Sequence, residues 1–224
     1  MLKKDTHAMQ KHGLNYLVGF DSKPRRFKPW LGDSLSFLYD LIMKRSIFPR
    51  KLAADITKHH DILRKELKDV HGRSVLELAT GTGSATLFLE NDNFYIGTDI
   101  SPGLLKRAAR KCHAAGFEQA ELYVTSADDL PFDESVFDLC LCILSLNFFD
   151  DLNQVVQEVY RVLIPGSFFL CVVPVPERNI RGSRIRGMMR SEGELREVFH
   201  DQGFVFERLS DDNGALLYFK AVKA

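Results

Sequence analysis

Cysteine, tryptophan and net charge are all scarce in this sequence. The 224 residues include four cysteines and one tryptophan, and 30 lysines and arginines balance 30 acidic residues. A chain without net charge lacks the field that would hold the whole protein on nucleic acid or on an anionic membrane. Any basic contact surface is therefore local.

The four cysteines form neither a disulfide pattern nor a metal pattern. Cys112, Cys140, Cys142 and Cys171 lie in apolar runs and lack the spacing of a disulfide framework or a zinc site. Cys140 and Cys142 fall on one face of a predicted strand, but no His or Cys pair nearby would complete metal coordination. We therefore predict buried, reduced thiols and no metal site.

Long apolar runs are also missing. No run approaches the ~20 residues of a membrane span, and residues 1–10, MLKKDTHAMQ, lack the apolar stretch of a signal peptide. We expect a cytoplasmic location. The 45% hydrophobic content is nevertheless enough to bury a full core, in one domain or in a domain with an appendage.

An internal boundary is predicted near Val70, where charged helical sequence gives way to short alternating strand and helix signals. Residues 14–30 are rich in Lys, Arg, Pro and aromatics and are predicted to be irregular, whereas residues 35–43 and 52–67 carry helical spacing. We therefore predict a helical cap over residues 1–70 and a single compact domain over residues 71–224.

Strand and helix signals alternate after this boundary. Strands are predicted at residues 74–78, 94–98, 121–124, 137–144 and 168–173. Ser101-Pro102 and a capping box at Ser191 and Glu194 each predict a helix start, and apolar residues at 155–163 predict a further helix. Runs at 204–209 and 215–222 flank a polar turn and predict a closing hairpin. Such alternation builds a mostly parallel sheet with helices on both faces.

The strongest chemical signal is VLELATGTGSA at residues 75–85, a strand that runs into two glycines and then into a predicted helix. Gly81 and Gly83 allow the backbone to approach a ligand where a Cβ would clash, although a tight strand-to-helix connection needs glycines as well. Asp99 ends the next strand, where it can accept hydrogen bonds from both ribose hydroxyls of a nucleoside or cap the helix that follows. Thr86 stands where a dinucleotide-binding turn needs its third glycine, which counts against NAD.

Four motifs in order resemble the class I S-adenosylmethionine-dependent methyltransferases over residues 39–221, and among them the group similar to the ubiquinone/menaquinone biosynthesis C-methyltransferases. VLELATGTGSA is similar to the first motif, with Ala79 in place of its first glycine. YIGTDISPGLL at 95–105 and SADDLPFDESVFD at 126–138 resemble the segments that hold the ribose and the adenine, and RVLIPGSFFL at 161–170 resembles the signature at the start of the strand predicted at 168–173. The resemblance implies an α/β, Rossmann-like fold with a mostly parallel seven-stranded sheet and an antiparallel last strand.

The same resemblance implies S-adenosylmethionine as the cofactor, S-adenosylhomocysteine as the product and no metal. The implied cofactor contacts are Glu77, Ala79, Thr80, Gly81, Gly83, Asp99, Ile100, Ser126, Ala127, Asp128 and Leu144, with Tyr39 of the cap closing over the cofactor.

Two departures from the family pattern bear on the acceptor and the adenine. Ser126 stands where relatives place the Asp that bonds the adenine amino group, and Asp128 is a nearby substitute. LSLNFF at 144–149 carries neither the His nor the Asn/Asp-Pro-Pro-aromatic motif of relatives, so methylation at C, O or N stays open. The candidate acceptor contacts are Asn147, Phe148, Arg181 and Arg184.

The chemistry implied is in-line displacement at a sulfonium methyl group, in which the protein mainly positions the nucleophile and excludes water. No side chain identifies itself as a general base. Four histidines are candidates by their chemistry alone, with surface or helix-end positions as the alternative: His59, His60, His71 and His200.

Five arginines between residues 178 and 190 could grip a phosphate, a carboxylate or RNA, or lie in a solvated loop. Three functions follow: methyl transfer to a small molecule, methyl transfer to RNA or protein through the arginine-rich loop, and cofactor binding without catalysis. The first is favoured, with nucleic acid disfavoured as a partner because the rest of the chain supplies no basic surface. A homodimer stays open.

Overall fold

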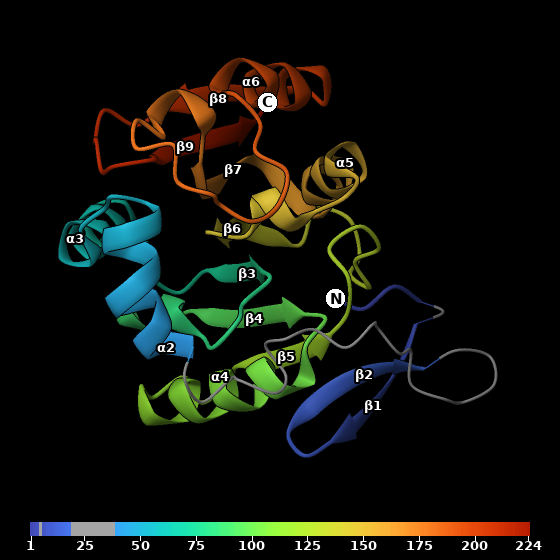
Figure 1. Ribbon diagram of the computed structural model, residues 1–224. Helices are drawn as coiled ribbons and strands as arrows, with labels where there is room; N and C mark the ends of the chain where they lie inside the picture. The colour runs from blue at the N-terminus through green and yellow to red at the C-terminus, as the bar shows by residue number, and fades with distance from the viewer. Residues whose placement is uncertain (5, 19–38) are drawn as a thin grey trace.

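The computed structural model describes residues 1–4, 6–18 and 39–224, and the side chains of Tyr39 and Asp40 lie outside this description (Figure 1). The elements in chain order are β1 (His7–Lys11), β2 (Leu14–Val18), α2 (Tyr39–Ile42), the π-helical segment η2 (Met43–Lys51), α3 (Ile56–Leu67), β3 (Ser74–Leu78), the 3₁₀ turn η3 (Ser84–Leu87), β4 (Phe94–Asp99), α4 (Pro102–Ala114), β5 (Glu121–Val124), β6 (Phe137–Ile143), η4 (Leu146–Phe148), α5 (Leu152–Val162), β7 (Leu163–Pro174), η5 (Pro176–Arg178), α6 (Glu192–Asp201), β8 (Phe204–Arg208) and β9 (Leu216–Lys223).

One sheet runs through the molecule in the order β1-β2-β5-β4-β3-β6-β7-β9-β8 (Figure 1). Strands β5, β4, β3, β6 and β7 are parallel to one another, and β9 is antiparallel to both β7 and β8. The predicted α/β class, the mostly parallel sheet and the antiparallel last strand are confirmed. The described residues contribute nine strands to this sheet, so the predicted count of seven is wrong.

The two additional strands come from the N-terminal segment. Leu14–Val18, which we predicted to be irregular, pairs parallel to β5 and antiparallel to His7–Lys11. His12 and Gly13 join the two strands with φ of 53° and 75°, and positive φ at both positions is the geometry of a tight hairpin turn. His-Gly is not among the usual hairpin dipeptides, so this turn could not be predicted from its two residues.

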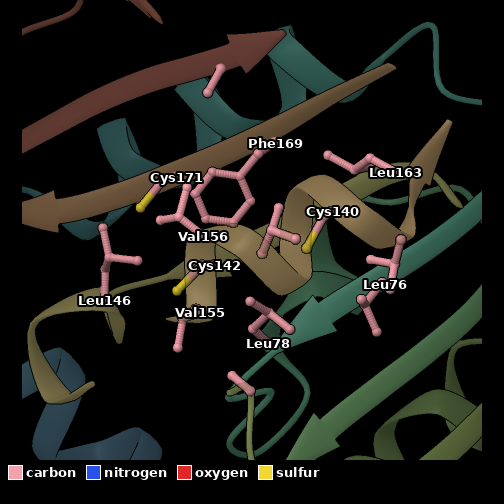
Figure 2. Close-up of a cluster of buried hydrophobic side chains, with 14 of the residues drawn as sticks. Leu76, Leu78, Cys140, Cys142, Leu146, Val155, Val156, Leu163, Phe169 and Cys171 are labelled. Atoms are coloured by element: carbon pink, nitrogen blue, oxygen red, sulfur yellow. The ribbon is translucent and has the colours of Figure 1, made fainter. Parts of the chain in front are cut away.

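Helices cover both faces of the sheet. Apolar residues of α5 and α6 pack on one face, and those of α3 and α4 pack on the other. Figure 2 shows Val155 and Val156 of α5 against side chains of the central strands, including Cys140, Cys142 and Cys171. These thiols and that of Cys112 are free and buried, as predicted. No helix in the described part of the chain is long and apolar enough to cross a membrane.

The predicted helix starts are confirmed at α4 and α6. Ser101 accepts a hydrogen bond from the backbone N–H of Leu104 and Pro102 follows it, while Ser191 and Glu194 form a complete capping box. Helix α3 begins at Ile56 rather than near Leu52, because Asp55 caps it by accepting from two backbone N–H groups.

Residues 79–83, which contain Gly81 and Gly83, form the glycine turn. The helix predicted after this turn is wrong, since Ser84–Leu87 forms only one 3₁₀ turn. The Thr86 hydroxyl donates to the Gly83 carbonyl at 2.8 Å and so competes for the acceptor that an α-helix would use.

Candidate functional site

The loops after β3, β4 and β6 meet at the carboxyl edge of the central strands, where two adjoining cavities lie. Cavity A has a volume of about 260 Å³ and cavity B about 240 Å³. Ala79, Gly81 and Ser145 line both, so the glycine turn and the turn after β6 separate them. Ligands of open parallel sheets bind at this edge.

Left-handed backbone shapes the glycine turn. Ala79 has φ of 48°, and Gly81 and Gly83 have φ of 58° and 77°. An added Cβ at Gly81 would have only the Ala79 carbonyl oxygen within 4 Å, whereas at Gly83 it would lie 3.0 Å from the Cα of Ala108. Gly81 therefore leaves open space beside both cavities, and Gly83 lets α4 pack against the turn.

Asp99 fastens β4 to the glycine turn. Its two carboxylate oxygens accept the backbone N–H groups of Gly81 and of Ser101, each at 2.8 Å. The side chain is 8% exposed and lines cavity B. The cap of the following helix, the alternative role predicted for Asp99, belongs to Ser101. A carboxylate offers about four acceptor positions, so Asp99 can hold these two backbone N–H groups and also face a ligand.

Cavity B brings together most of the residues predicted to contact the adenosine. Ile100, Ser126, Ala127 and Asp128 all line it, and Phe148 lies on the same wall. Phe148 is 48% exposed, so part of its ring faces solvent. The cavity therefore offers polar groups from the 126–128 segment and apolar surface from Ile100 and Phe148.

Glu77 is a buried carboxyl group at the floor of cavity A. It is 2% exposed, and the Tyr95 hydroxyl donates a hydrogen bond to it. Burial raises the pKa of Glu77 to about 8, and the negative charge of Asp99 acts in the same direction. The Lys111 ammonium lowers this pKa and lines the same cavity. Thr80, also predicted, lines cavity A, and its hydroxyl donates to the Glu77 carbonyl at 3.2 Å.

Leu144, the residue that follows β6, has a left-handed backbone conformation. Its φ is 60°, and its backbone N–H donates to the Val172 carbonyl at 2.7 Å. Non-glycine residues adopt such a φ at a cost of about 1–2 kcal/mol. Leu144 lines cavity A, and so does Ala79. These two non-glycine residues with positive φ directly follow the adjacent strands β6 and β3. Backbone strain of this kind concentrates at functional sites.

Helices η2 and α3 also line cavity A. Phe48, Ile56, His59 and His60 line it, and none of them was among the predicted cofactor contacts. His59 is 3% exposed, so its alternative as a surface residue is wrong. Its burial could have been predicted from its spacing, because His59 stands three and four residues before Ile62 and Leu63, on the apolar stripe of α3.

Some predicted residues lie away from both cavities. Gly83 and Asn147 line neither. The buried Asn147 side chain donates to the Arg186 carbonyl at 2.6 Å, and its backbone carbonyl accepts the Met188 N–H at 2.7 Å. Asn147 thus anchors the 178–190 segment. The predicted contact from Tyr39 lies outside the described side chains.

The arginine-rich segment is partly used within the fold. Arg178 donates to the Leu216 carbonyl at 2.7 Å and pairs with Asp212 at 2.9 Å. Arg181 donates to the Pro49 carbonyl at 3.4 Å, while Arg184 is exposed. Neither Arg181 nor Arg184 lines cavity A or cavity B, so their contact with an acceptor stays a prediction.

Metal-ligating side chains do not gather at this edge. Within residues 1–4, 6–18 and 39–224, no group of three or more His, Cys, Asp or Glu side chains is arranged to hold a metal ion.

The central part of the chain is similar to a known family. Residues 76–171 match the family model described as "Methyltransferase domain". The chain is 35% identical over 114 residues to a demethylmenaquinone methyltransferase of Thermus thermophilus, an alignment that covers 49% of this chain and 51% of that protein. The chain spans about half the length of the curated relatives it matches.

Two solved structures share the fold. A putative methyltransferase in complex with the Haloferax volcanii Trm112 methyltransferase activator aligns with a TM-score of 0.69 at 19% identity, covering 88% of this chain and 99% of that one. Geranyl diphosphate C-methyltransferase of Streptomyces coelicolor A3(2), in complex with S-adenosyl-L-homocysteine, aligns with a TM-score of 0.62 at 14% identity, covering 75% and 76%. At these identities the likeness concerns the fold alone.

Proposed function

We propose that this chain transfers the methyl group of S-adenosylmethionine to a small-molecule acceptor, because residues 76–171 match the family model described as "Methyltransferase domain". The observation that carries the proposal is the arrangement of Asp99 and the glycine turn. A buried carboxylate fixed by the Gly81 N–H stands beside a glycine that leaves both cavities open.

The residues at this edge fit a nucleoside cofactor with an amino-acid end. In our proposal Asp99 accepts the ribose hydroxyls in cavity B, with Ile100 against the adenine and Ser126 or Asp128 at its polar edge. Glu77 and Lys111 line cavity A and supply one acidic and one basic group for the amino-acid end. Ala79 and Gly81, which line both cavities, then lie beside the part of the cofactor that joins the two.

When bound, the cofactor supplies an electrophilic methyl group. The chain's own contribution is to orient the two reactants and to exclude water, which converts a bimolecular reaction into a reaction within one complex. The walls of cavity A suit this role, because Phe48, Ile56 and Phe88 surround the space with apolar side chains. No residue is needed as a general base for the positioning effect itself.

The acceptor that we propose is a small, largely apolar molecule. Most of the surface that lines cavity A is apolar, and its volume of about 260 Å³ is small beside the ~300–1,000 Å³ of typical ligand pockets, which favours a small acceptor. The curated relatives that are demethylmenaquinone methyltransferases support an acceptor of this kind. Incubation with S-adenosylmethionine and demethylmenaquinol tests it directly, with methylated product measured by mass spectrometry.

The cofactor is tested first by calorimetric titration with S-adenosylhomocysteine. We expect a Kd in the micromolar range, on the order of 1–100 μM, and at least a roughly tenfold loss for Asp99→Ala because ribose hydrogen bonds to a charged group are worth ~1.5–3 kcal/mol. Asp69→Ala removes an equal charge from an exposed surface position and should bind like the wild type.

Two results would contradict the proposal. One is the absence of S-adenosylhomocysteine binding by the folded wild-type protein, and the other is tighter binding of NAD than of S-adenosylhomocysteine. Binding without turnover on any acceptor would instead support the third function named above, a cofactor-binding protein without catalysis.

A further inference from the structure

A buried histidine on α3 faces cavity A and is held by a hydroxyl group of β9. His59 Nδ1 lies 3.0 Å from the Tyr218 hydroxyl, and both side chains are almost fully buried. His59 lines cavity A together with Glu77, Ala79 and Leu144. The ring nitrogen that carries the proton therefore determines whether His59 can donate or accept a hydrogen bond in cavity A.

The orientation of a neighbouring amide is fixed by backbone groups. Asn213 Oδ1 accepts the backbone N–H of Asp55 at 2.8 Å, and Asn213 Nδ2 donates to the Asp55 carbonyl at 2.8 Å. A backbone N–H only donates and a carbonyl only accepts, so the amide cannot be reversed. The same Nδ2 is 3.1 Å from the Tyr218 hydroxyl, to which it donates its second hydrogen.

This amide fixes the direction of the Tyr218 hydroxyl. Because the hydroxyl oxygen accepts from Asn213, its own proton is directed to its other partner in the described part of the chain, His59 Nδ1. Nδ1 is then the acceptor nitrogen of the ring. A neutral imidazole has one protonated nitrogen, so the proton of His59 lies on Nε2.

The charge state of the ring agrees with this assignment. Burial lowers the pKa of His59 to about 3, and the adjacent His60 acts in the same direction. The ring therefore stays neutral at pH 7. Apart from this ring, the titratable groups of cavity A with an acid or ammonium function are the lysines Lys44 and Lys111 and the carboxyl group of Glu77.

We propose that His59 presents its Nε2–H to cavity A as a neutral hydrogen-bond donor for an oxygen atom of the methyl acceptor, with Tyr218 and Asn213 as positioning residues that fix the tautomer. The proposal rests on the proposed function and adds a selection rule to it. An acceptor with an oxygen at this point gains a hydrogen bond, whereas one without it leaves a buried N–H unpaired. A neutral donor also adds no positive charge beside a reaction centre that is itself cationic.

The tautomer is measured by nitrogen NMR of the protein labelled at histidine. We expect His59 to show a protonated Nε2 and an unprotonated Nδ1, unchanged between about pH 5.5 and 8.5. His71 is the internal control, because it is exposed and its hydrogen bond to Asp92 raises its pKa, so its signals should titrate. Tyr218→Phe keeps the ring and removes the hydroxyl, and should give a mixture of both tautomers.

Donation to a ligand is measured with 1-naphthol and naphthalene, two probes that differ by one hydroxyl group. We expect the wild type to bind 1-naphthol roughly tenfold more tightly than naphthalene, as one buried hydrogen bond allows. His59→Leu should bring this ratio close to one. His59→Gln, whose amide can donate from near the Nε2 position, should retain part of it.

The outcomes separate this proposal from the proposed function. A protonated Nδ1 in the wild type, or an unchanged probe ratio in a folded His59→Leu protein, would overturn the role of His59. Titration with S-adenosylhomocysteine on the same samples reports on cofactor binding alone, so its failure would count against the methyltransferase and not against the tautomer.

Discussion

Gly81 and Gly83 stand two positions apart in one turn, but an added methyl group would meet different surroundings at each. At Gly83 it would press on Ala108 of α4, and at Gly81 it would enter space beside the cavities. We expect Gly83→Ala to lower the free energy of unfolding by roughly 2–4 kcal/mol, from backbone strain and overpacking together. For Gly81→Ala we expect about 1–2 kcal/mol, from strain alone.

Ligand binding should show the reverse order. Gly81→Ala should weaken S-adenosylhomocysteine binding more than Gly83→Ala does, since only Gly81 lines the cavities. Chemical denaturation and calorimetry on both variants check the pair of expectations. If both variants lost stability and affinity in the same proportion, the division of roles between the two glycines would be refuted.

At the scale of elements, Asn213 ties the β8–β9 hairpin to the start of α3. It satisfies both the N–H and the carbonyl of Asp55, the residue that caps this helix. Asn213→Ala leaves two partly buried backbone groups without these partners, so we expect a loss of roughly 2 kcal/mol or more of stability. Amide hydrogen exchange should become faster in the first turn of α3.

Ser191→Ala is the matched comparison for that variant. It removes the cap of α6, which lies on the other face of the sheet, and should cost about 1 kcal/mol. Its faster exchange should be confined to α6. Faster amide exchange of α3 in Ser191→Ala, or unchanged amide exchange of α3 in Asn213→Ala, would contradict the link between Asn213 and the start of α3.

Local sequence signals predicted the elements that depend on their own residues. The caps at Ser101 and Ser191 and the alternation of strands and helices after Val70 could be predicted, because hydrogen bonds and apolar spacing within each segment determine them. The strand at Leu14–Val18 could not, since it pairs with β5 through contacts between distant segments. The same holds for His59, whose partner Tyr218 is 159 residues away.

At the scale of the whole molecule, Glu77 makes the stability of the fold depend on pH. Its carboxyl group has a pKa of about 8 in the folded protein, against an ordinary value of 4.5. The folded state therefore holds this proton more tightly than the unfolded chain does. The resulting stability is complete below pH 4.5 and is lost as pH rises to about 8.

Glu77→Gln should remove this dependence. We expect the free energy of unfolding of the variant to decline less than that of the wild type between pH 4.5 and pH 8. His59 acts in the opposite sense, because its pKa of about 3 means that stability is lost as pH falls below its ordinary 6.5. Denaturation curves at several pH values check this, and parallel profiles for wild type and Glu77→Gln would refute the raised pKa.

The insertion of β9 between β7 and β8 also sets an order of events during synthesis. The wall of cavity A that α3 supplies leaves the ribosome early, but Asn213 and Tyr218, which fasten it, are made more than 150 residues later. Until then β7 lacks its antiparallel neighbour and His59 has no hydroxyl partner from β9. The nascent chain can therefore hold most of its parallel sheet while the cavity stays unfinished, and β9 completes a wall that α3 begins.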